Sequence, residues 1–411
     1  MRLFIQKTPQ SIRALPKLPS SKSISNRLLM ISALSGNKIS AINLSESDDT
    51  RTMIRLLQSK DKIKDAGHAG TTMRFLTAFY SIGNEEVILT GTERMKNRPI
   101  GKLVEALVEL GASIDYLEKK GYPPLRIRGK RLEGKQIKID SGISSQYISA
   151  LLMTAPYLKG GLEIILEGET LSYSYIELTL SLMQEAGARV EKKNNIIRVK
   201  ESPYVEKTIT AEADWSSASY WFMIAGMHPD AEIMLKGLQK KSYQGDSHIT
   251  AMFDNLGVRS GFSEEGLKLT GSEVSLKEFR YDFRNNPDMV QSFIPYCIAK
   301  SIPFYFSGCR SLRIKETDRV KALYNELLKF GVEISFSNDG DLLWWDGKTK
   351  PDWNRKVRIE TYKDHRMALG MAPLSIKTNQ LIIEDPEVVS KSYPGFWNDI
   401  EKAGFVINKQ P

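Results

Sequence analysis

Residues 313–319 (RIKETDR) combine two cations, Lys315 and Arg319, with a carboxylate, Glu316, in one short segment. If a helix begins near Lys315, Lys315 and Arg319 share a face at a spacing of four residues, and Glu316 can pair with Arg319 at a spacing of three. Arg319 could then bind a carboxylate or phosphate through two parallel hydrogen bonds, while Lys315 or Glu316 carries a proton. The competing interpretation is a solvated helix with intrahelical ion pairs.

Similar chemistry is available where other amphipathic helix patterns begin. Hydroxyl groups or cations stand at the helix starts within or just after residues 18–27, 67–74, 97–101, 144–146 and 364–366. Free backbone N–H groups and the helix dipole favour an anion at such positions, and Lys22 adds a full charge. Serine-rich caps are also common for structural reasons alone. Because these features recur across the chain, we predict sites for anionic ligands.

A repeat positions these segments. Five amphipathic helix patterns end in glycine and pass directly into a strand-like run, at Gly111, Gly187, Gly257, Gly331 and Gly404. The glycines are separated by 76, 70, 74 and 73 residues. Glycine is the expected left-handed residue at a helix C-terminus, and so steady a spacing indicates a duplicated unit of about 70 residues. A sixth, degenerate copy without its glycine begins with the helix pattern at residues 50–58, so we expect two domains of three copies.

Pro and Ser cluster at residues 15–20, and a polar segment lies at residues 212–217, where the chain is expected to cross between domains. A discontinuous terminal domain would then comprise residues 1–19 plus 213–411, with residues 20–212 as the inserted domain. The active site is expected in the cleft between the domains, a common place for ligands.

The chain carries a formal charge of +9, from 58 Lys and Arg against 49 Asp and Glu. Such a balance is compatible with nucleic acid, a membrane surface or small acidic substrates. The densest basic tract, residues 119–138, alternates apolar and charged residues as half-buried strands do, and no nucleic-acid motif accompanies it. We therefore expect no nucleic-acid partner.

Composition predicts a folded protein: 41% of its 411 residues are hydrophobic. The longest apolar stretch, residues 147–158, is about half of the ~20 residues that a membrane span needs. The N-terminus shows no signal-peptide pattern, so we expect no membrane association and a cytoplasmic location. Cys297 and Cys309 are too few for a disulfide framework and are expected to be buried thiols. The histidines show no ligand spacing, so no metal site is expected.

Motifs along the whole chain resemble those of the 5-enolpyruvylshikimate-3-phosphate synthase family (3-phosphoshikimate 1-carboxyvinyltransferases). The motifs that carry the resemblance are LPSSKSISNR, HAGTTMR, NRPIGKLVEAL, SGISSQYISALLM, DWSSASYW, QGD at residues 244–246, RIKETDRV, KDHRMA and SKSYPGFW. The resemblance implies a two-domain α/β enolpyruvyl transferase fold. Each domain has three βαβαββ units with pseudo-threefold symmetry (an inside-out α/β barrel), and one unit is abbreviated.

The resemblance also implies the reaction. Members of this family move the enolpyruvyl group of phosphoenolpyruvate onto the 5-hydroxyl of shikimate 3-phosphate by addition and elimination, releasing phosphate on the way to chorismate and the aromatic amino acids. They need no metal or organic cofactor. We therefore expect two small-molecule substrates, and a monomer.

Site residues follow from the same resemblance. Shikimate 3-phosphate would be bound by Lys22, Ser23, Arg27, Ser144, Ser145, Gln146, Ser172, Tyr175, Asp288 and Lys315. Phosphoenolpyruvate would be bound by Lys22, Gly70, Arg98, Gln146, Arg319, Arg366 and Lys391. Asp288 would take the proton of the attacking hydroxyl, while Glu316 and Lys22 would handle the proton at the methylene carbon. A carboxylate such as Glu316 can both donate that proton and stabilise the cationic character that follows.

The sequence departs from the family pattern in several places. Ser311 stands where Asn is usual, His68 where Asn or Asp is common, and Phe75 where Pro is frequent; a strand pair is missing between Ser59 and Ala66. The nearest rival is the related UDP-N-acetylglucosamine enolpyruvyl transferase, which uses a cysteine in its inserted domain, whereas both cysteines here lie outside it. A non-catalytic anion-binding protein on the same fold is the other alternative.

Overall fold

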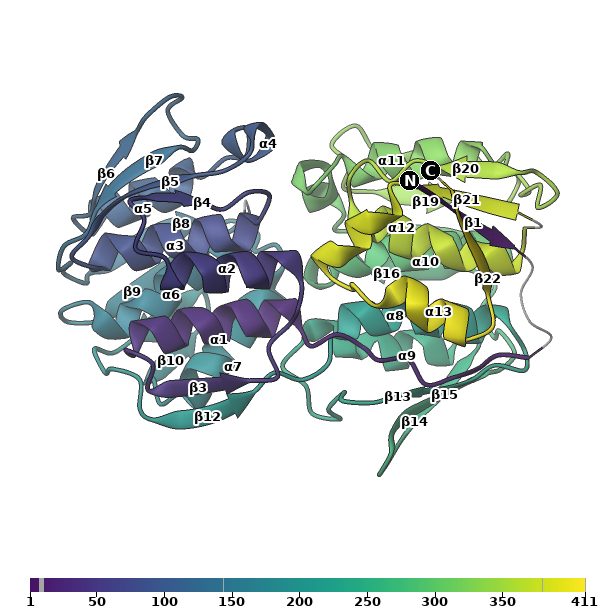
Figure 1. Ribbon diagram of the computed structural model, residues 1–411, viewed down its shortest axis with the longest axis horizontal. Helices are drawn as coiled ribbons and strands as arrows, with labels where there is room; N and C mark the ends of the chain where they lie inside the picture. The colour runs from purple at the N-terminus through teal and green to yellow at the C-terminus, as the bar shows by residue number, and fades with distance from the viewer. Residues whose placement is uncertain (7–10, 143, 379, 411) are drawn as a thin grey trace. The chain divides into compact units, whose positions relative to one another are not determined.

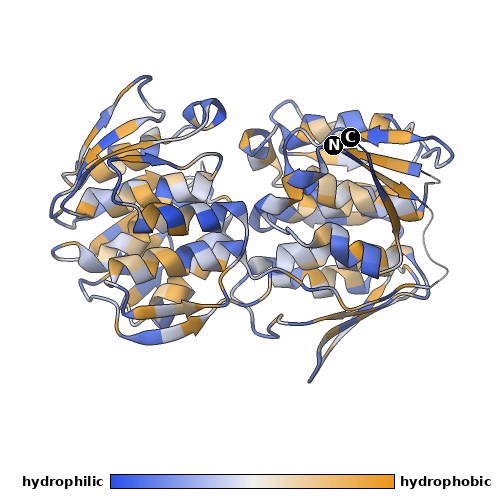
Figure 2. Ribbon diagram, viewed as in Figure 1, coloured by the Kyte–Doolittle hydropathy of each residue, from blue (hydrophilic) through white to orange (hydrophobic). Residues whose placement is uncertain are grey.

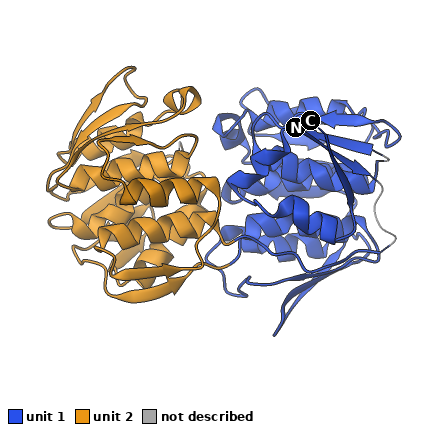
Figure 3. Cartoon of the chain, viewed as in Figure 1, with its two compact units in different colours: residues 1–19, 213–411 blue, residues 20–212 orange. Residues whose placement is uncertain are grey.

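The computed structural model describes residues 1–6, 11–142, 144–378 and 380–410. The chain forms two compact units (Figure 3): unit 1 comprises residues 1–19 and 213–411, and unit 2 comprises residues 20–212. Each unit has its own hydrophobic core. The resembling motif SGISSQYISALLM includes Ile143, which lies outside the described residues.

Unit 2 contains two four-stranded sheets, in the orders β4-β5-β7-β6 and β10-β11-β9-β8, and the two-stranded sheet β12-β3 (Figure 1). Its strands are β3 (Ile39–Ile42), β4 (Ile63–Asp65), β5 (Glu86–Thr90), β6 (Ser113–Tyr116), β7 (Leu125–Arg128), β8 (Gln136–Asp140), β9 (Leu162–Glu167), β10 (Val190–Lys193), β11 (Ile196–Val199) and β12 (Lys207–Thr210). Its helices are α1 (Lys22–Leu34), α2 (Asp48–Gln58), α3 (Gly70–Ile82), α4 (Glu93–Lys96), α5 (Gly101–Glu109), α6 (Ser145–Thr154), η1 (Ala155–Tyr157) and α7 (Tyr173–Glu185).

Unit 1 contains three four-stranded sheets, in the orders β20-β21-β1-β22, β14-β15-β13-β2 and β16-β17-β19-β18. Its strands are β1 (Arg2–Gln6), β2 (Arg13–Ala14), β13 (Glu232–Leu235), β14 (Val258–Ser263), β15 (Gly266–Gly271), β16 (Phe279–Asp282), β17 (Phe304–Ser307), β18 (Ser335–Phe336), β19 (Leu343–Trp345), β20 (Val357–Ile359), β21 (Gln380–Glu384) and β22 (Val406–Gln410).

The α-helices of unit 1 are α8 (Trp215–Met227), α9 (Ile249–Asp254), α10 (Val290–Lys300), α11 (Arg319–Leu328), α12 (His365–Met371) and α13 (Phe396–Lys402). Short 3-10 helices join them: η2 (Gly245–His248), η3 (Phe283–Asn285), η4 (Pro287–Met289), η5 (Arg310–Ile314), η6 (Ala372–Ile376) and η7 (Pro386–Lys391). Every residue of α8 is buried, including its three serines. Figure 2 shows hydrophilic and hydrophobic residues mixed along the helices of both units.

One pairing pattern is repeated in all five four-stranded sheets. In the sheet of β8 to β11, for example, β8 pairs parallel with β9, β9 pairs antiparallel with β11, and β10 and β11 form a hairpin. A helix connects β8 to β9 and another connects β9 to β10. Three copies are contiguous βαβαββ units, as the resemblance implied. In the copy with β2, residues 20–212 separate β2 from α8, and in the copy with β20 the N-terminal strand β1 completes the sheet.

The glycines that define the repeat have the predicted backbone. Gly111, Gly187, Gly257, Gly331 and Gly404 have φ values of +98°, +94°, +96°, +82° and +96°, in the left-handed region that favours glycine. The sixth copy consists of β12, α1, β3 and α2, and α2 leads into β4 without a hairpin between them. The prediction of one abbreviated copy is confirmed.

Two smaller predictions, one on the strands of the basic tract and one on the cysteines, are also confirmed. Burial alternates along β7 and β8, as expected for strands with one wet face. Cys297 and Cys309 are buried free thiols. Among the described residues, no helix is long and apolar enough to cross a membrane, and no cluster of His, Cys, Asp and Glu could hold a metal ion.

Candidate functional site

The segment at residues 313–319 begins its helix later than predicted. Lys315 follows the 3-10 helix η5 and lies outside any helix, and α11 begins at Arg319. The reason is Asp318, whose carboxylate accepts a hydrogen bond from Lys321 N at 3.2 Å and caps the helix there. Lys315 and Arg319 therefore share no helical face. The predicted pair between Glu316 and Arg319 does form, at 3.0 Å.

Arg319 is the centre of a charged network in unit 1. Its side chain is 1% exposed, and it makes two hydrogen bonds to Asp364, with Nε 2.7 Å from Oδ2 and Nη2 3.2 Å from Oδ1. Nη1 also donates to Asp288 at 3.1 Å and Nη2 to Glu316 at 3.0 Å. Burial works to lower the pKa of Arg319, but Asp364, Glu316 and Asp288 outweigh it and raise the pKa above its usual range.

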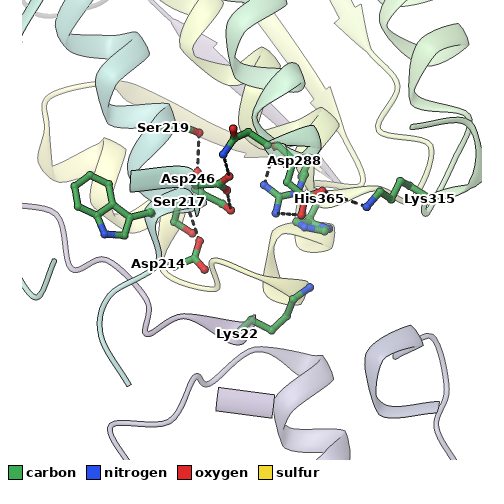
Figure 4. A network of polar contacts seen from close by, with 12 residues as sticks. Lys22, Asp214, Ser217, Ser219, Asp246, Asp288, Lys315 and His365 are labelled. Atoms are coloured by element: carbon green, nitrogen blue, oxygen red, sulfur yellow. Dashed lines mark hydrogen bonds and ion pairs between the residues drawn. The ribbon is translucent and has the colours of Figure 1, made fainter. Parts of the chain in front are cut away.

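Asp288, in η4, contacts three cations. Besides Arg319, Oδ2 lies 3.1 Å from Arg366 Nη2, and Oδ1 lies 3.8 Å from Lys315 Nζ (Figure 4). Arg366 also donates to the main-chain oxygen of Asp288 at 3.1 Å, which fixes the backbone beside the carboxylate. Burial lowers the pKa of Lys315, although Asp288 acts in the opposite direction. A carboxylate and a lysine whose pKa is lowered thus lie together.

Glu316 contacts two cations, Arg319 and Lys391. One oxygen accepts from Arg319, and the other lies 3.0 Å from Lys391 Nζ, at the end of η7. The structure thus brings together, within unit 1, six of the predicted site residues: Asp288, Lys315, Glu316, Arg319, Arg366 and Lys391.

Behind this network lies a buried carboxyl group, Asp246. Ser216 Oγ donates to one of its oxygens at 2.5 Å and Asn286 Nδ2 to the other at 3.2 Å. Burial raises the pKa of Asp246 to about 6, and the negative charge of Asp288 adds to this rise, while Arg366 opposes it.

In unit 2, Lys22 and Ser23 open α1. Ser21 is the N-cap, and its hydroxyl accepts from Ile24 N at 3.5 Å. Lys22 Nζ lies 3.4 Å from Asp49 Oδ2, at the start of α2. The predicted hydroxyl-rich helix start is therefore present, and a carboxylate that the sequence did not single out partners its lysine.

Arg27 is buried on the same helix among neutral groups. Its Nε donates to Thr179 at 2.7 Å, Nη1 to the main-chain oxygen of Ser23 at 2.9 Å, and Nη2 to Ser149 and the main-chain oxygen of Tyr175 at 3.2 Å each. Burial lowers the pKa of Arg27 to about 10. A buried cation without a carboxylate among these contacts favours an anionic ligand.

Gly70 lies between two arginines. A Cβ atom at Gly70 would stand 2.5 Å from Arg98 Nη1 and 2.7 Å from Arg74 Nη1, so a side chain there would displace the two guanidinium groups. Arg74 donates to the main-chain oxygen of Gly70 at 2.9 Å, and its guanidinium lies 5.6 Å from the ring centre of Tyr147. The start of α3 thus presents two positive charges and a closely approachable backbone.

The remaining predicted residues lie at two other helix starts of unit 2. Ser144 caps α6 by accepting from Gln146 N at 3.3 Å, and Ser145 is the first helical residue. Gln146 Nε2 donates to Thr71 at 3.2 Å, which links this helix to the start of α3. Ser172, with φ of +57°, precedes α7, whose first turn carries Tyr175.

Asp364, Arg74 and Asp246 are the charged residues that the sequence analysis left without a role. Asp364 is fully buried and is the partner with the shortest contact to Arg319, yet 45 residues separate the two in the chain. Its capping position before α12 was visible, but its ion pair depends on the tertiary fold. Arg74 lay within a motif quoted above and was detectable there.

The architecture defines the class of protein. The solved structure of EPSP synthase from Acinetobacter baumannii covers 100% of both chains with a TM-score of 0.77 at 19% sequence identity. At that identity the likeness speaks for the fold, which is the two-domain enolpyruvyl transferase fold expected above.

Sequence comparison identifies the family. The family model for EPSP synthase (3-phosphoshikimate 1-carboxyvinyltransferase) matches residues 7–60 and 55–400. A 3-phosphoshikimate 1-carboxyvinyltransferase from Bacteroides fragilis is 46% identical over 405 residues, 98% of each chain. One from Photobacterium damsela subsp. piscicida is 34% identical over 414 residues, covering 94% of this chain and 95% of the relative. The chain belongs to the EPSP synthase family and is a transferase, which confirms the resemblance drawn from its motifs.

Proposed function

We propose that this protein transfers the enolpyruvyl group of phosphoenolpyruvate to the 5-hydroxyl of shikimate 3-phosphate and releases phosphate. Family membership supports this activity. One structural observation supports the residues proposed to act in it. Asp288 and Glu316 are both hydrogen-bonded to the buried Arg319, at 3.1 and 3.0 Å. Two carboxylates fixed on one guanidinium provide a base and an acid for two proton transfers in the same reaction.

In the proposed addition step, Asp288 takes the proton of the 5-hydroxyl as its oxygen bonds to C2 of phosphoenolpyruvate, and C3 receives a proton from Glu316 or Lys22. In the elimination step, C3 returns a proton to the group that supplied it, the C2–O bond to phosphate breaks, and the proton taken by Asp288 leaves with phosphate. Cationic character at C2 develops near the carboxylate of Glu316, which stabilises it. Neither step consumes an oxidant or reductant, so the reaction needs no redox cofactor.

The ion pairs of unit 1 suggest how binding prepares the base. The carboxylate of phosphoenolpyruvate is proposed to bind Arg319 and Arg366, two of the three cations that now hold Asp288. An incoming carboxylate that took over these donors would release Asp288 to accept a proton, with Lys315 beside it. Lys391 would leave Glu316 in the same way to bind the phosphate. Substrate binding and base activation would then be one event.

The residues of unit 2 are proposed to hold the anionic groups. Arg98, Gln146 and the backbone at Gly70 would bind the phosphate of phosphoenolpyruvate, whose charge suits the two arginines beside Gly70. Ser144, Ser145 and Ser172 would bind the phosphate of shikimate 3-phosphate. Ser23 and Arg27 would bind its carboxylate, with Tyr175 and Gln146 packed against it. Lys315 and Asp288 are also proposed to bind shikimate 3-phosphate, and Lys22 to contact both substrates.

We further propose that the protein works in the cytoplasm as a monomer on these two metabolites, without nucleic-acid or membrane partners. The rival UDP-N-acetylglucosamine transferase activity is disfavoured because the only two cysteines, Cys297 and Cys309, belong to unit 1 and are buried. A purely anion-binding role would leave Asp288 and Glu316 without a purpose.

A steady-state phosphate-release assay with both substrates tests the proposal. Phosphate should appear only when shikimate 3-phosphate and phosphoenolpyruvate are both present. Asp288→Ala and Glu316→Ala should each lower kcat by roughly 10²-fold or more, the usual worth of a positioned acid or base. Glu333→Ala, an exposed carboxylate on the same unit, is the control. Phosphate release from phosphoenolpyruvate alone, or full activity in either variant, would refute the assignment.

A further inference from the structure

The segment that carries Lys315 and Glu316 is attached to a turn that contributes no residue to the proposed chemistry. This turn, residues 337–342, connects β18 to β19 and is called here the β18–β19 turn. Cys309 N donates to the main-chain oxygen of Asp341 at 3.0 Å, and Arg310 forms an ion pair with Asp339 at 2.9 Å. Both contacts lie at the beginning of η5, ahead of Lys315 and Glu316 in the chain.

Arg313 makes the contact nearest to the reactive residues. Its Nη2 donates to the main-chain oxygen of Ser337 at 3.3 Å, and its guanidinium lies 5.7 Å from the ring centre of Phe336. The residue is only two positions before Lys315 and three before Glu316. It belongs to the motif that first indicated anion chemistry, yet none of the steps proposed above uses it.

Gly340 fits the turn closely around this side chain. Gly340 is buried and has φ of +74°, and a Cβ atom there would stand 2.2 Å from Arg313 Nε and 2.9 Å from Cδ. The same turn is internally fixed, because Ser337 accepts from Gly340 N at 2.8 Å and Ser337 Oγ donates to Asp339 at 2.6 Å. The Arg313 side chain therefore lies between the Phe336 ring and Gly340, in the space that a Cβ atom at residue 340 would need.

We propose that Arg313 is a positioning residue: by docking on Phe336 and Gly340 it fixes Lys315 and Glu316 for the transfer reaction. The inference rests on the proposed function, since it assumes that these two residues act on the substrates. Residues 315–318, between the end of η5 and the start of α11, lie outside the helices and strands. Arg313 on one side and the Asp318 cap on the other define their path. A displacement of about 1 Å at such a group can cost on the order of 10²-fold in rate.

The test compares kcat and KM across variants that leave every substrate contact in place. Arg313→Gln should lower kcat about 10-fold or more, with KM for phosphoenolpyruvate within about threefold, because neither Lys315 nor Glu316 is proposed to bind that substrate. Arg313→Lys keeps a cation over the Phe336 ring and should restore part of kcat. The control is Arg355→Gln, because Arg355 likewise lies over a left-handed glycine, Gly331, near the other end of α11. It should keep wild-type kcat.

A double-mutant cycle separates positioning from simple loss of stability. Gly340→Ala alone should lower kcat as Arg313→Gln does, because the new methyl group displaces the guanidinium. With Arg313→Ala already present the clash is gone, so adding Gly340→Ala should change kcat less than it does in the wild type. Additive effects, or an unchanged kcat in Arg313→Gln, would overturn the inference. If Glu316→Ala is inactive while Arg313→Gln is fully active, only this inference fails; if Glu316→Ala is itself active, the proposed function fails.

Discussion

Arg319 in unit 1 and Arg27 in unit 2 are both buried, but their electrostatic surroundings are opposite. In unit 1, the buried Arg319 contacts three carboxylates, at distances between 2.7 and 3.2 Å. In unit 2, the equally buried Arg27 has hydrogen bonds to hydroxyl and main-chain oxygens and lies 5.6 and 5.8 Å from two aromatic ring centres. Burial lowers the pKa of Arg27, whereas the carboxylates raise that of Arg319.

This difference corresponds to two tasks. A cation among carboxylates gives a site where protons can be moved and charges exchanged, because the carboxylates are acids and bases held in place. A cation among neutral acceptors is electrostatically incomplete and gains most when a ligand supplies the missing negative charge. The surroundings of Arg319 thus fit the proposed chemistry and those of Arg27 fit the proposed binding of an anion, and stability and affinity should respond differently to the removal of either arginine.

The largest contrast is expected from Arg319→Met. Asp364, Glu316 and Asp288 would then be close together without their shared guanidinium, and breaking a buried pair of this kind usually costs about 3–5 kcal/mol. We expect unit 1 to unfold at a clearly lower urea concentration and activity to be lost. Arg310→Met, which removes an exposed arginine paired with Asp339, is the matched control. An unfolding midpoint equal to that of the control would show that the network is not held by Arg319.

Sequence reasoning succeeded where the information was local. The glycine that ends each helix can be recognised because no other residue adopts its backbone as easily, and five of them in register revealed the repeat. The Glu316–Arg319 pair was predictable from a spacing of three residues. The start of α11 was misplaced although Asp318 is a favourable N-cap, because the charges of Lys315 and Glu316 drew the prediction toward them.

The partners that decide the electrostatics could not be predicted in the same way. Asp364 reaches Arg319 from another copy of the repeat, and Asn286 reaches Asp246 across 40 residues of chain. Such pairs are set by how whole elements pack, and no periodicity in the sequence encodes them. The sequence therefore predicted which residue types gather in the site and the local pair of Glu316 with Arg319, but not the pairs between distant segments.

A smaller effect is expected from Arg27→Met, in unit 2. No carboxylate among the described contacts of Arg27 would be left without its partner. The free energy of unfolding should therefore stay within about 1 kcal/mol of the wild-type value. The loss of a charged hydrogen bond to the ligand should raise KM for shikimate 3-phosphate about 10-fold or more, because such bonds contribute roughly 1.5–3 kcal/mol. Arg128→Met, an exposed arginine paired with Asp115, is the control. A large loss of stability with unchanged KM would reverse the comparison between the units.

The smallest effect concerns the buried Asp246, whose pKa is raised to about 6 by burial and by Asp288, against the opposing charge of Arg366. A carboxyl with a raised folded pKa binds its proton more tightly in the folded state, so its contribution to stability is present at acid pH and is lost as pH rises through about 6. Between about pH 5 and about pH 7 this loss should amount to about 1 kcal/mol. In Asp246→Asn the loss should disappear, because the amide does not ionise and can still meet Ser216 and Asn286. Urea unfolding at the two pH values measures this, with Asp254→Asn, an exposed aspartate of α9, as the control. If Asp246→Asn keeps the wild-type pH dependence, the proton is not held at Asp246, and the carboxylates around Arg319 must account for the titration instead.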